Sequence, residues 1–204
     1  MAILLDYSQV SIANLMQQDE TDVSVDLFRH MVLQSIKYYR TRFVSEYGEV
    51  IICCDSTNYW RKKLFPQYKI NRKRTKQYQT RDWDMIFQCL NQVREELKET
   101  FPYIVLHVET TEADDIIAIL CQMEQENNII VSGDKDFLQL QKYEGVNQYS
   151  PNRRDMISVD NPEQFKRLHI MRGDSSDGVP NFLSPDNTFA DKIRQKPLSN
   201  KKLN

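Results

Sequence analysis

The stretch Val50-Ile51-Ile52-Cys53-Cys54-Asp55 decides the fold of this 204-residue chain, because it reads as a short buried strand that ends in a carboxylate. Two similar stretches flank it, Ala2-Ile3-Leu4-Leu5-Asp6 and Ile129-Ile130-Val131-Ser132-Gly133-Asp134. A further apolar run, residues 103–108, opens after Pro102. Apolar runs of this length, bounded by turn residues, are typical of strands that are covered on both faces.

Helical patterns lie between these strands. Apolar residues recur at helical spacing from Ser24, which can act as the N-cap, to about Tyr47, and Gly48 ends the helix. Further helices are predicted over residues 82–99, from residue 111 onward, and over residues 162–172 after two short β-like stretches. Strands that alternate with helices predict an α/β fold with a parallel-rich central sheet and helices on both faces.

Acidic residues stand where three of these strands end, namely Asp6, Asp55 and Asp134. The carboxyl ends of parallel strands meet at one edge of a sheet, so these side chains should converge there. Two unit charges about 4 Å apart repel by roughly 4 kcal/mol at an effective dielectric near 20, so such a cluster needs cations. Oxygen ligands favour hard ions, and the pattern predicts two Mg²⁺ ions, for which Mn²⁺ can substitute.

The other acidic clusters also admit a purely structural interpretation. Thr111-x-x-Asp114 matches a capping box, and acids in a first helical turn favour the helix dipole. Gly133-Asp134 can be a simple turn, and Gly173-Asp174-Ser175 can end one helix and cap the next element. Each cluster taken singly favours the structural interpretation, and their combination with the strand-end acids favours a metal site.

Basic residues are concentrated in one segment, although the formal net charge is only −2. Residues 57–81 hold nine Lys or Arg and no Asp or Glu, with Tyr59, Trp60, Tyr68 and Tyr78 between them. A solvated helix face is the structural alternative. Binding of single-stranded nucleic acid explains the segment better, because its cations can neutralise phosphates and its rings can stack on unpaired bases.

Composition excludes several classes of protein. With 40% hydrophobic and 27% charged residues the chain is not disordered throughout, and no apolar run approaches the roughly 18 residues that span a bilayer. The first residues are too few and too acidic for a signal peptide. We therefore expect a cytoplasmic protein with no membrane partner. Cys53, Cys54, Cys89 and Cys121 lack C-x-x-C spacing and are interpreted as reduced core residues.

In this order, the motifs resemble those of the flap-endonuclease (5′-nuclease) superfamily, most closely its T-even-phage RNase H type. The resemblance covers residues 1 to about 180. The matching residues are Leu5-Asp6-Tyr7-Ser8-Gln9, Cys54-Asp55, Tyr59-Trp60-Arg61, Tyr68-Lys69-x-x-Arg72, Thr111-Glu112-Ala113-Asp114-Asp115, Ser132-Gly133-Asp134-x-Asp136-Phe137-x-Gln139-Leu140 and Gly173-Asp174-x-x-Asp177.

The resemblance implies a role for each of these residues. The first metal ion would be surrounded by Asp6, Asp55, Glu112, Asp114 and Asp134, and the second would be held by Asp115, Asp136, Asp174 and Asp177. Lys69 and Arg72 would lie in a helical arch and grip the scissile phosphate. The residues expected to bind nucleic acid beside them are Tyr59, Trp60, Arg61, Lys62, Tyr68, Lys73, Arg74 and Lys76.

The same resemblance implies a domain organisation. Residues 1–160 would form a PIN-like 5′-nuclease domain with the arch at about 57–81, and residues 161–204 would begin a helix–three-turn–helix that binds duplex. That motif is only partial here, so we expect a truncated or naturally short form. The family's substrates are DNA and RNA–DNA hybrids with 5′ ends or flaps, and the expected role is RNA-primer removal in phage DNA replication. The chain is expected to be monomeric, with a replication clamp or a single-strand-binding protein as candidate partners.

Two other functions remain open at this point. A PIN-type single-strand ribonuclease shares the fold and part of the acidic set, but it usually lacks the long basic arch and the late Gly-Asp-x-x-Asp. A non-catalytic, structure-specific DNA-binding module should have lost some of the carboxylates, and none of the expected set is missing.

Overall fold

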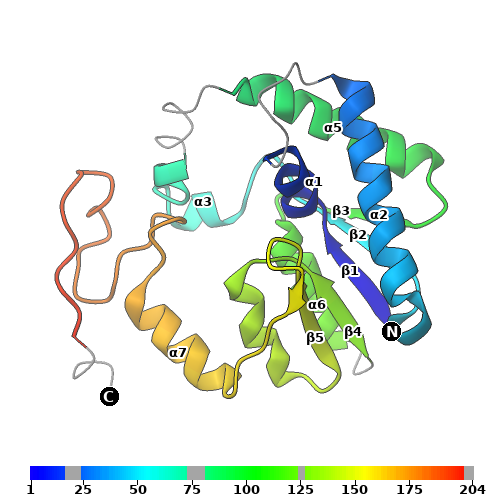
Figure 1. Ribbon diagram of the computed structural model, residues 1–204. Helices are drawn as coiled ribbons and strands as arrows, with labels where there is room; N and C mark the ends of the chain where they lie inside the picture. Colours follow the sequence, from blue (N-terminus) through cyan, green and yellow to red (C-terminus); the bar gives the residue numbers. More distant parts are fainter. Residues whose placement is uncertain (17–23, 73–80, 124–126, 200–204) are drawn as a thin grey trace. The chain divides into compact units, whose positions relative to one another are not determined.

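The computed structural model describes residues 1–16, 24–72, 81–123 and 127–199 (Figure 1). Its contacts divide the chain into two compact units, which are described separately. The first unit consists of Met1–Asn58 and Asp82–Asp160, and the second consists of Tyr59–Arg81 and Asn161–Asn204. The basic segment, which the sequence assigned to the catalytic domain, is therefore grouped by contacts with the C-terminal part of the chain.

The first unit is built on a six-stranded sheet with the strand order β3-β2-β1-β4-β5-β6. The strands are β1 (Ala2–Asp6), β2 (Val50–Cys54), β3 (Ile104–His107), β4 (Asn128–Val131), β5 (Val146–Ser150) and β6 (Asp155–Met156). The first five strands pair in parallel and β6 pairs antiparallel with β5. The predicted parallel-rich sheet is confirmed, and β1 lies at its centre.

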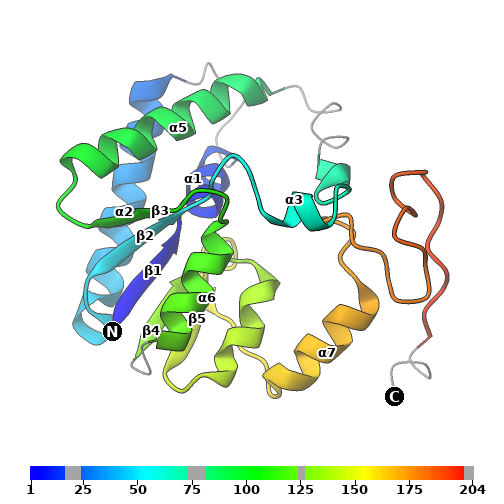
Figure 2. The ribbon, with the colours of Figure 1, turned by 180° about the vertical axis from the view of Figure 1, so that it is seen from behind.

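Helices cover both faces of this sheet (Figures 1 and 2). They are α1 (Tyr7–Met16), α2 (Val25–Tyr47), α5 (Trp83–Thr100), α6 (Ala113–Met123) and the 3-10 helix η1 (Lys135–Lys142). One core cluster joins α1, α2 and α5 to side chains such as Ile3, Ile52 and Val131. A second joins α6 and η1 to the opposite face through Leu4, Cys53 and others. Successive side chains along each strand therefore point to opposite faces of the sheet and pack into two separate cores.

Most helix boundaries follow the caps that the sequence predicts. The Ser24 side chain accepts a hydrogen bond from the backbone N–H of Leu27, and Gly48 ends α2 with a φ of 80°. Asp82 caps α5 in the same way. Two helices, α1 and η1, were not predicted. All four cysteines are free and buried, as expected.

The second unit contains α3 (Arg61–Leu64) and α7 (Pro162–Arg172). Asn161 caps α7, Pro162 occupies its first turn, and Gly173 ends it. The predicted nucleic-acid contacts Lys73, Arg74 and Lys76 lie outside the described residues. In the part of the chain that the structure describes, none of the helices has the length and apolarity needed to cross a membrane.

Candidate active site

Asp6 lies at the carboxyl end of the central strand and at the beginning of α1. Its carboxylate accepts hydrogen bonds from the backbone N–H of Gln9 (3.1 Å) and from the Ser132 hydroxyl (3.0 Å). The first bond makes Asp6 the N-cap of α1, so a carboxylate faces the positive end of that helix. Only 6% of the residue is exposed. Asp6 therefore combines a structural role with a position at the sheet edge.

Asp55 follows the neighbouring strand and is tied to the beginning of α6. One of its oxygens accepts a hydrogen bond from the Ala113 backbone N–H (2.8 Å). The Ser56 N–H also donates to the Thr111 carbonyl (2.9 Å). These two bonds join the end of β2 to the beginning of α6, where Glu112 precedes the helix and Asp114 and Asp115 lie in its first turn.

The cap of α6 differs from the capping box expected at Thr111. The helix begins at Ala113, and the Thr111 hydroxyl donates to the Glu109 carbonyl instead. The reciprocal bond of a capping box is shifted by one residue, because the Glu112 N–H donates to the Asp115 carboxylate (3.1 Å). The predicted capping box at Thr111-x-x-Asp114 is therefore wrong, and the Asp115 carboxylate accepts the capping hydrogen bond instead.

Asp134 lies in the loop after β4 and begins η1. Its carboxylate accepts a hydrogen bond from the Asp136 N–H (2.9 Å), so Asp136 lies directly beside it. The Asp134 N–H in turn donates to the Ser132 hydroxyl (3.2 Å), the same hydroxyl that donates to Asp6. Ser132 thus links the loops after β1 and β4 and fixes their spacing.

Burial and the neighbouring carboxylates together shift the pKa of Asp6. Burial raises the pKa of Asp6 to about 7, and the charges of Asp55 and Asp134 add to that rise against the hydrogen bonds from Gln9 and Ser132. The three strand-end acids therefore interact, as their positions in the sequence predicted. An oxygen-only donor set whose own charges destabilise it fits a hard divalent cation.

The raised pKa of Asp6 predicts a pH-dependent stability for the metal-free protein. Because the folded pKa of Asp6 lies above the ordinary value of 3.8, stability should fall as pH rises from about 4 to about 7. Asp6→Asn removes the ionisation, so the free energy of unfolding of the variant should not show this fall. Relative to the wild type, it should therefore rise by a few kcal/mol between pH 4.5 and pH 8, given about 1.36 kcal/mol per pKa unit. Urea unfolding in EDTA at pH 4.5 and pH 8 measures the difference. Parallel pH profiles of the two proteins would contradict it.

Gln148, which no sequence pattern singles out, holds the Asp134 loop from the neighbouring strand β5. Its side-chain N–H₂ group donates to the carbonyls of Ser132 (2.9 Å) and Asp134 (2.6 Å), and the residue is fully buried. A strand glutamine has no distinguishing pattern in a sequence. It becomes recognisable only when the parallel pairing of β4 with β5 places it beside the loop.

Gln148→Leu should therefore lower both stability and metal affinity. The buried Ser132 carbonyl would lose this donor at a cost of about 1–3 kcal/mol, and the half-buried Asp134 carbonyl would lose it at a smaller cost. The loop that presents Asp134 would also lose its support, which should weaken Mg²⁺ affinity about tenfold. Thermal unfolding and Mg²⁺ titration by calorimetry measure the two effects. Gln141→Leu is the matched control, because Gln141 also donates to a backbone carbonyl, that of Ile157 (2.8 Å), away from the acids. Equal metal affinities in the two variants would exclude the supporting role.

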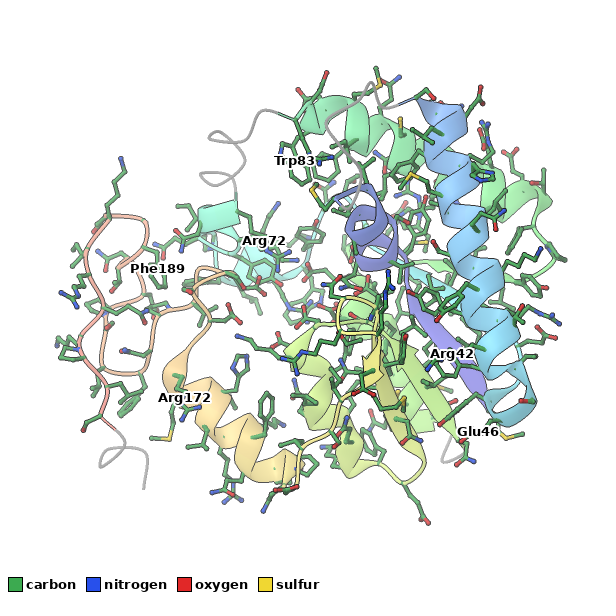
Figure 3. All side chains as sticks on the ribbon, viewed as in Figure 1. Arg42, Glu46, Arg72, Trp83, Arg172 and Phe189 are labelled. Atoms are coloured by element: carbon green, nitrogen blue, oxygen red, sulfur yellow. The ribbon has the colours of Figure 1, made fainter. Side chains whose placement is uncertain are left out.

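The second unit places Asp177 against the basic segment. The Asp177 carboxylate accepts hydrogen bonds from Arg72 (2.6 Å) and from the Tyr68 hydroxyl (3.2 Å), and its backbone carbonyl accepts from the Lys69 N–H (2.7 Å) (Arg72 is labelled in Figure 3). Asp174 instead organises its own turn by accepting hydrogen bonds from the Ser176 N–H and hydroxyl. Gly173 ends α7 and Asp174 caps the turn that follows, as the structural interpretation of this cluster predicted. The roles of Asp174 and Asp177 at a second metal ion stay predictions.

Aromatic rings and cations alternate in the described part of the basic segment, residues 59–72. The Lys69 ammonium lies 4.9 Å from the Tyr59 ring centroid and 5.0 Å from that of Tyr68. The Arg61 guanidinium lies 4.6 Å from the Trp60 ring centroid. Trp60 is 41% exposed, so its ring is accessible for stacking. These cation–π contacts gather Lys69 and its neighbours into one basic and aromatic surface.

Known proteins resemble this chain in sequence and in fold. A family model described as 5′-3′ exonuclease, N-terminal resolvase-like domain, matches residues 7–168, which include Asp55 and Asp134 and begin directly after Asp6. The chain belongs to the 5′-3′ exonuclease family. Ribonuclease H of Enterobacteria phage T4 is similar to this 5′-3′ exonuclease family member, with 32% identity over 186 residues. The match covers 86% of this chain and 61% of the phage T4 protein, so the chain spans less than two thirds of that relative.

Solved structures of phage T5 proteins share the fold of this family member. The T5 flap endonuclease, in a pseudo-enzyme–product complex with DNA and metal ions, gives a TM-score of 0.72 at 18% identity and covers 99% of this chain and 82% of that one. A T5 5′-exonuclease with bound zinc gives a TM-score of 0.72 at 17% identity and covers 100% of this chain and 83% of that one. The 5′-nuclease fold expected from the motifs is thereby confirmed.

Proposed function

We propose that the chain is a divalent-metal-dependent 5′ nuclease that hydrolyses phosphodiesters at 5′ ends or flaps of DNA or RNA–DNA hybrids. The observation that carries the proposal is the convergence of Asp6, Asp55 and Asp134, with a pKa of about 7 for buried Asp6. The mutual repulsion of three ionised carboxylates lowers stability, and a bound cation would offset it. Removal of RNA primers during phage DNA replication is the cellular role that fits this activity.

In the proposal, two sets of acids each hold one Mg²⁺ ion. The first is assigned to Asp6, Asp55, Glu112, Asp114 and Asp134, and the second to Asp115, Asp136, Asp174 and Asp177. Bound ions would supply an activated water and would stabilise charge on the scissile phosphate. Asp177 would have to exchange its contact with Arg72 for the second ion, which would release the Arg72 guanidinium towards a phosphate.

The chain's own residues then have distinct tasks in hydrolysis. The oxygen of water adds to phosphorus, the bond from phosphorus to the leaving sugar oxygen breaks, and that oxygen takes a proton. Lys69 and Arg72 would stabilise the charge that develops on the phosphate oxygens. Ser132 and Gln148 would keep the Asp6 and Asp134 loops in place. Tyr59, Trp60 and Tyr68 would contact the strand that bears the phosphate.

A cleavage assay tests this function directly. Radiolabelled 5′ flaps, nicked RNA–DNA hybrids and single-stranded RNA are incubated with the protein in Mg²⁺, in Mn²⁺ and in EDTA. Metal-dependent cleavage of the flap or the hybrid supports the proposal. Cleavage of single-stranded RNA alone would indicate a PIN-type ribonuclease. Metal-dependent binding of the flap without any cleavage would indicate a DNA-binding module.

Lys69→Ala should lower kcat about a hundredfold and leave the affinity for substrate within about threefold, because the contact acts mainly in the transition state. Lys62→Ala is the matched control, since the Lys62 ammonium also lies over the Tyr59 ring, at 4.7 Å. Single-turnover kinetics and binding in Ca²⁺ separate the two parameters. A loss of affinity as large as the loss of kcat would show that Lys69 only binds the strand.

A further inference from the structure

The first unit contains a pocket of about 540 Å³ that the acids do not line. Helix α2 forms one wall through His30, Gln34 and Tyr38, and the turn after β5 forms another through Pro151 and Arg154. Tyr39 and Tyr149 close the inner end. A volume of this size accommodates a small organic molecule with several polar groups.

The α2 wall presents groups that suit a planar heterocycle. His30, Gln34 and Tyr38 are four residues apart in turn, so they form one stripe along the helix. Tyr38 is 49% exposed, which leaves its ring accessible for stacking. The Gln34 amide and the His30 imidazole supply donors and acceptors beside that ring. A purely apolar ligand would leave these groups without partners.

The inner end of the pocket is an aromatic cluster braced by Arg42. The Tyr149 ring lies 6.0 Å from that of Tyr39 between centroids, and the Arg42 guanidinium lies 4.8 Å from the Tyr149 centroid (Arg42 is labelled in Figure 3). Arg42 also donates to the Tyr38 hydroxyl (3.0 Å). Tyr149 is only 1% exposed, so it forms the buried floor, and Arg42 contacts both Tyr149 and Tyr38.

The pocket is electropositive. The hydrogen bond from Arg42, then that from Tyr149, and the charges of Arg42 and Arg154 lower the pKa of Tyr38. Arg154 has a φ of 55°, in the left-handed region that non-glycine residues rarely adopt, at the turn that forms the wall. Asp155 is the acidic neighbour of Arg42 and offsets only part of this charge. The surplus of guanidinium groups favours an anionic ligand, and a phosphate fits both their charge and their geometry.

The wall that carries Arg154 adjoins the Asp134 loop. A Cβ atom on Gly133 would lie 3.2 Å from the Ser150 hydroxyl oxygen and 3.7 Å from the Asn152 side-chain nitrogen. The loop that presents Asp134 therefore contacts the turn that lines the pocket. A nucleic-acid strand that reaches the acids could place a neighbouring nucleotide in the pocket.

We infer that this pocket binds one unpaired nucleotide of the substrate, with its base against the Tyr38 ring and its phosphate at Arg154. The inference rests on the proposed nuclease function, and it adds a subsite that none of the acids or the basic segment provides. Stacking on one aromatic ring and one phosphate contact both act in the bound ground state, so they should affect binding more than the chemical step.

The test measures binding without cleavage. Fluorescence anisotropy in Ca²⁺ gives the Kd of the full chain and its variants for a 5′-flap duplex. Tyr38→Ala and Arg154→Ala should each raise Kd about tenfold, and kcat in Mg²⁺ should stay within about twofold. Tyr103→Ala and Arg40→Ala are the matched controls, because the Arg40 guanidinium lies 5.4 Å from the Tyr103 ring centroid outside the pocket. The controls should leave Kd within about twofold.

Two further readouts locate the ligand. A flap with 5-iododeoxyuridine at successive single positions should crosslink on irradiation to peptides that contain residues 30–39 or 149–154. Thymidine 5′-monophosphate should shift the NMR signals of Tyr38 and His30 in the wild type and not in Arg154→Ala. Unchanged Kd in both pocket variants would overturn the inference, even if the monophosphate binds, because the pocket would then serve a free nucleotide. Absence of cleavage by the wild type in Mg²⁺ would instead contradict the nuclease function. The Kd measurements in Ca²⁺ do not depend on cleavage, so the two failures can be told apart.

Discussion

Asp134→Asn is expected to lower the rate of phosphodiester cleavage by about a hundredfold to a thousandfold without unfolding the protein. The Asp134 carboxylate has two separable properties, since it accepts the hydrogen bond that begins η1 and it adds negative charge beside Asp6. Asparagine caps a helix about as well as aspartate, so the substitution removes only the charge. Single-turnover cleavage of a 5′ flap at saturating Mg²⁺ measures the loss.

Asp82→Asn is the matched control for this substitution. Asp82 caps α5 by accepting a hydrogen bond from the Met85 N–H (2.9 Å), as Asp134 accepts from Asp136 at the same distance. The two variants should have similar melting temperatures, and only Asp134→Asn should lose activity and Mg²⁺ affinity. If Asp134→Asn keeps a rate within tenfold of wild type, Asp134 is a structural cap and the proposed metal site is wrong.

Gly173→Ala is expected to disrupt the turn that carries Asp174 and Asp177. Gly173 has φ 70° and ψ −178°, a combination that is essentially restricted to glycine. A Cβ atom there would lie 2.5 Å from backbone atoms of Val179 and Pro180, which have no freedom to move aside as a side chain would. The paired hydrogen bonds between Asp174 and Val179, both 2.8 Å, should break as the chain shifts. We expect a local loss of about 3 kcal/mol.

The consequence should extend to the basic segment, because Asp177 is its anchor. Lys69, Tyr68 and Arg72 all bond to Asp177, so loss of the turn should release them. Hydrogen exchange measured by mass spectrometry should show faster exchange in peptides that cover residues 59–72 and 161–184, with residues 1–58 unchanged. Ser175→Ala, at an exposed position of the same turn, should exchange like the wild type. Unchanged protection of residues 59–72 in Gly173→Ala would contradict the anchoring role.

The strands and most helix caps follow directly from local sequence. The run Val50–Cys54 forms β2 with the predicted bounds, and Ser24 and Gly48 delimit α2. Such features depend on local rules: burial of short apolar runs, capping by a side-chain oxygen, and the freedom of glycine at positive φ. The predicted parallel pairing also holds, because helices that alternate with strands require crossover connections.

Helices α1 and η1 could not be predicted in this way. Helix α1 follows β1 without a loop, and its cap is Asp6, a residue whose sequence pattern already suggested a strand end and a metal ligand. Helix η1 is a 3-10 helix, whose shorter period departs from the pattern of α-helical amphipathicity. In both cases one acidic residue is a cap in the structure and also a candidate ligand, so the pattern that suggested the ligand gave no separate sign of the helix.

The sequence by itself determined which residues can form the strands and that Asp6, Asp55 and Asp134 share an edge of the sheet, since every parallel strand places its carboxyl end there. Only the tertiary structure decided what holds these acids and what anchors the basic segment. Ser132 bonds to both Asp6 and Asp134, Gln148 reaches the loop from β5, and Asp177 pairs with Arg72 across 105 residues of chain. These contacts depend on which segments become neighbours in space, and hydrogen bonds between distant side chains leave no periodicity in a sequence.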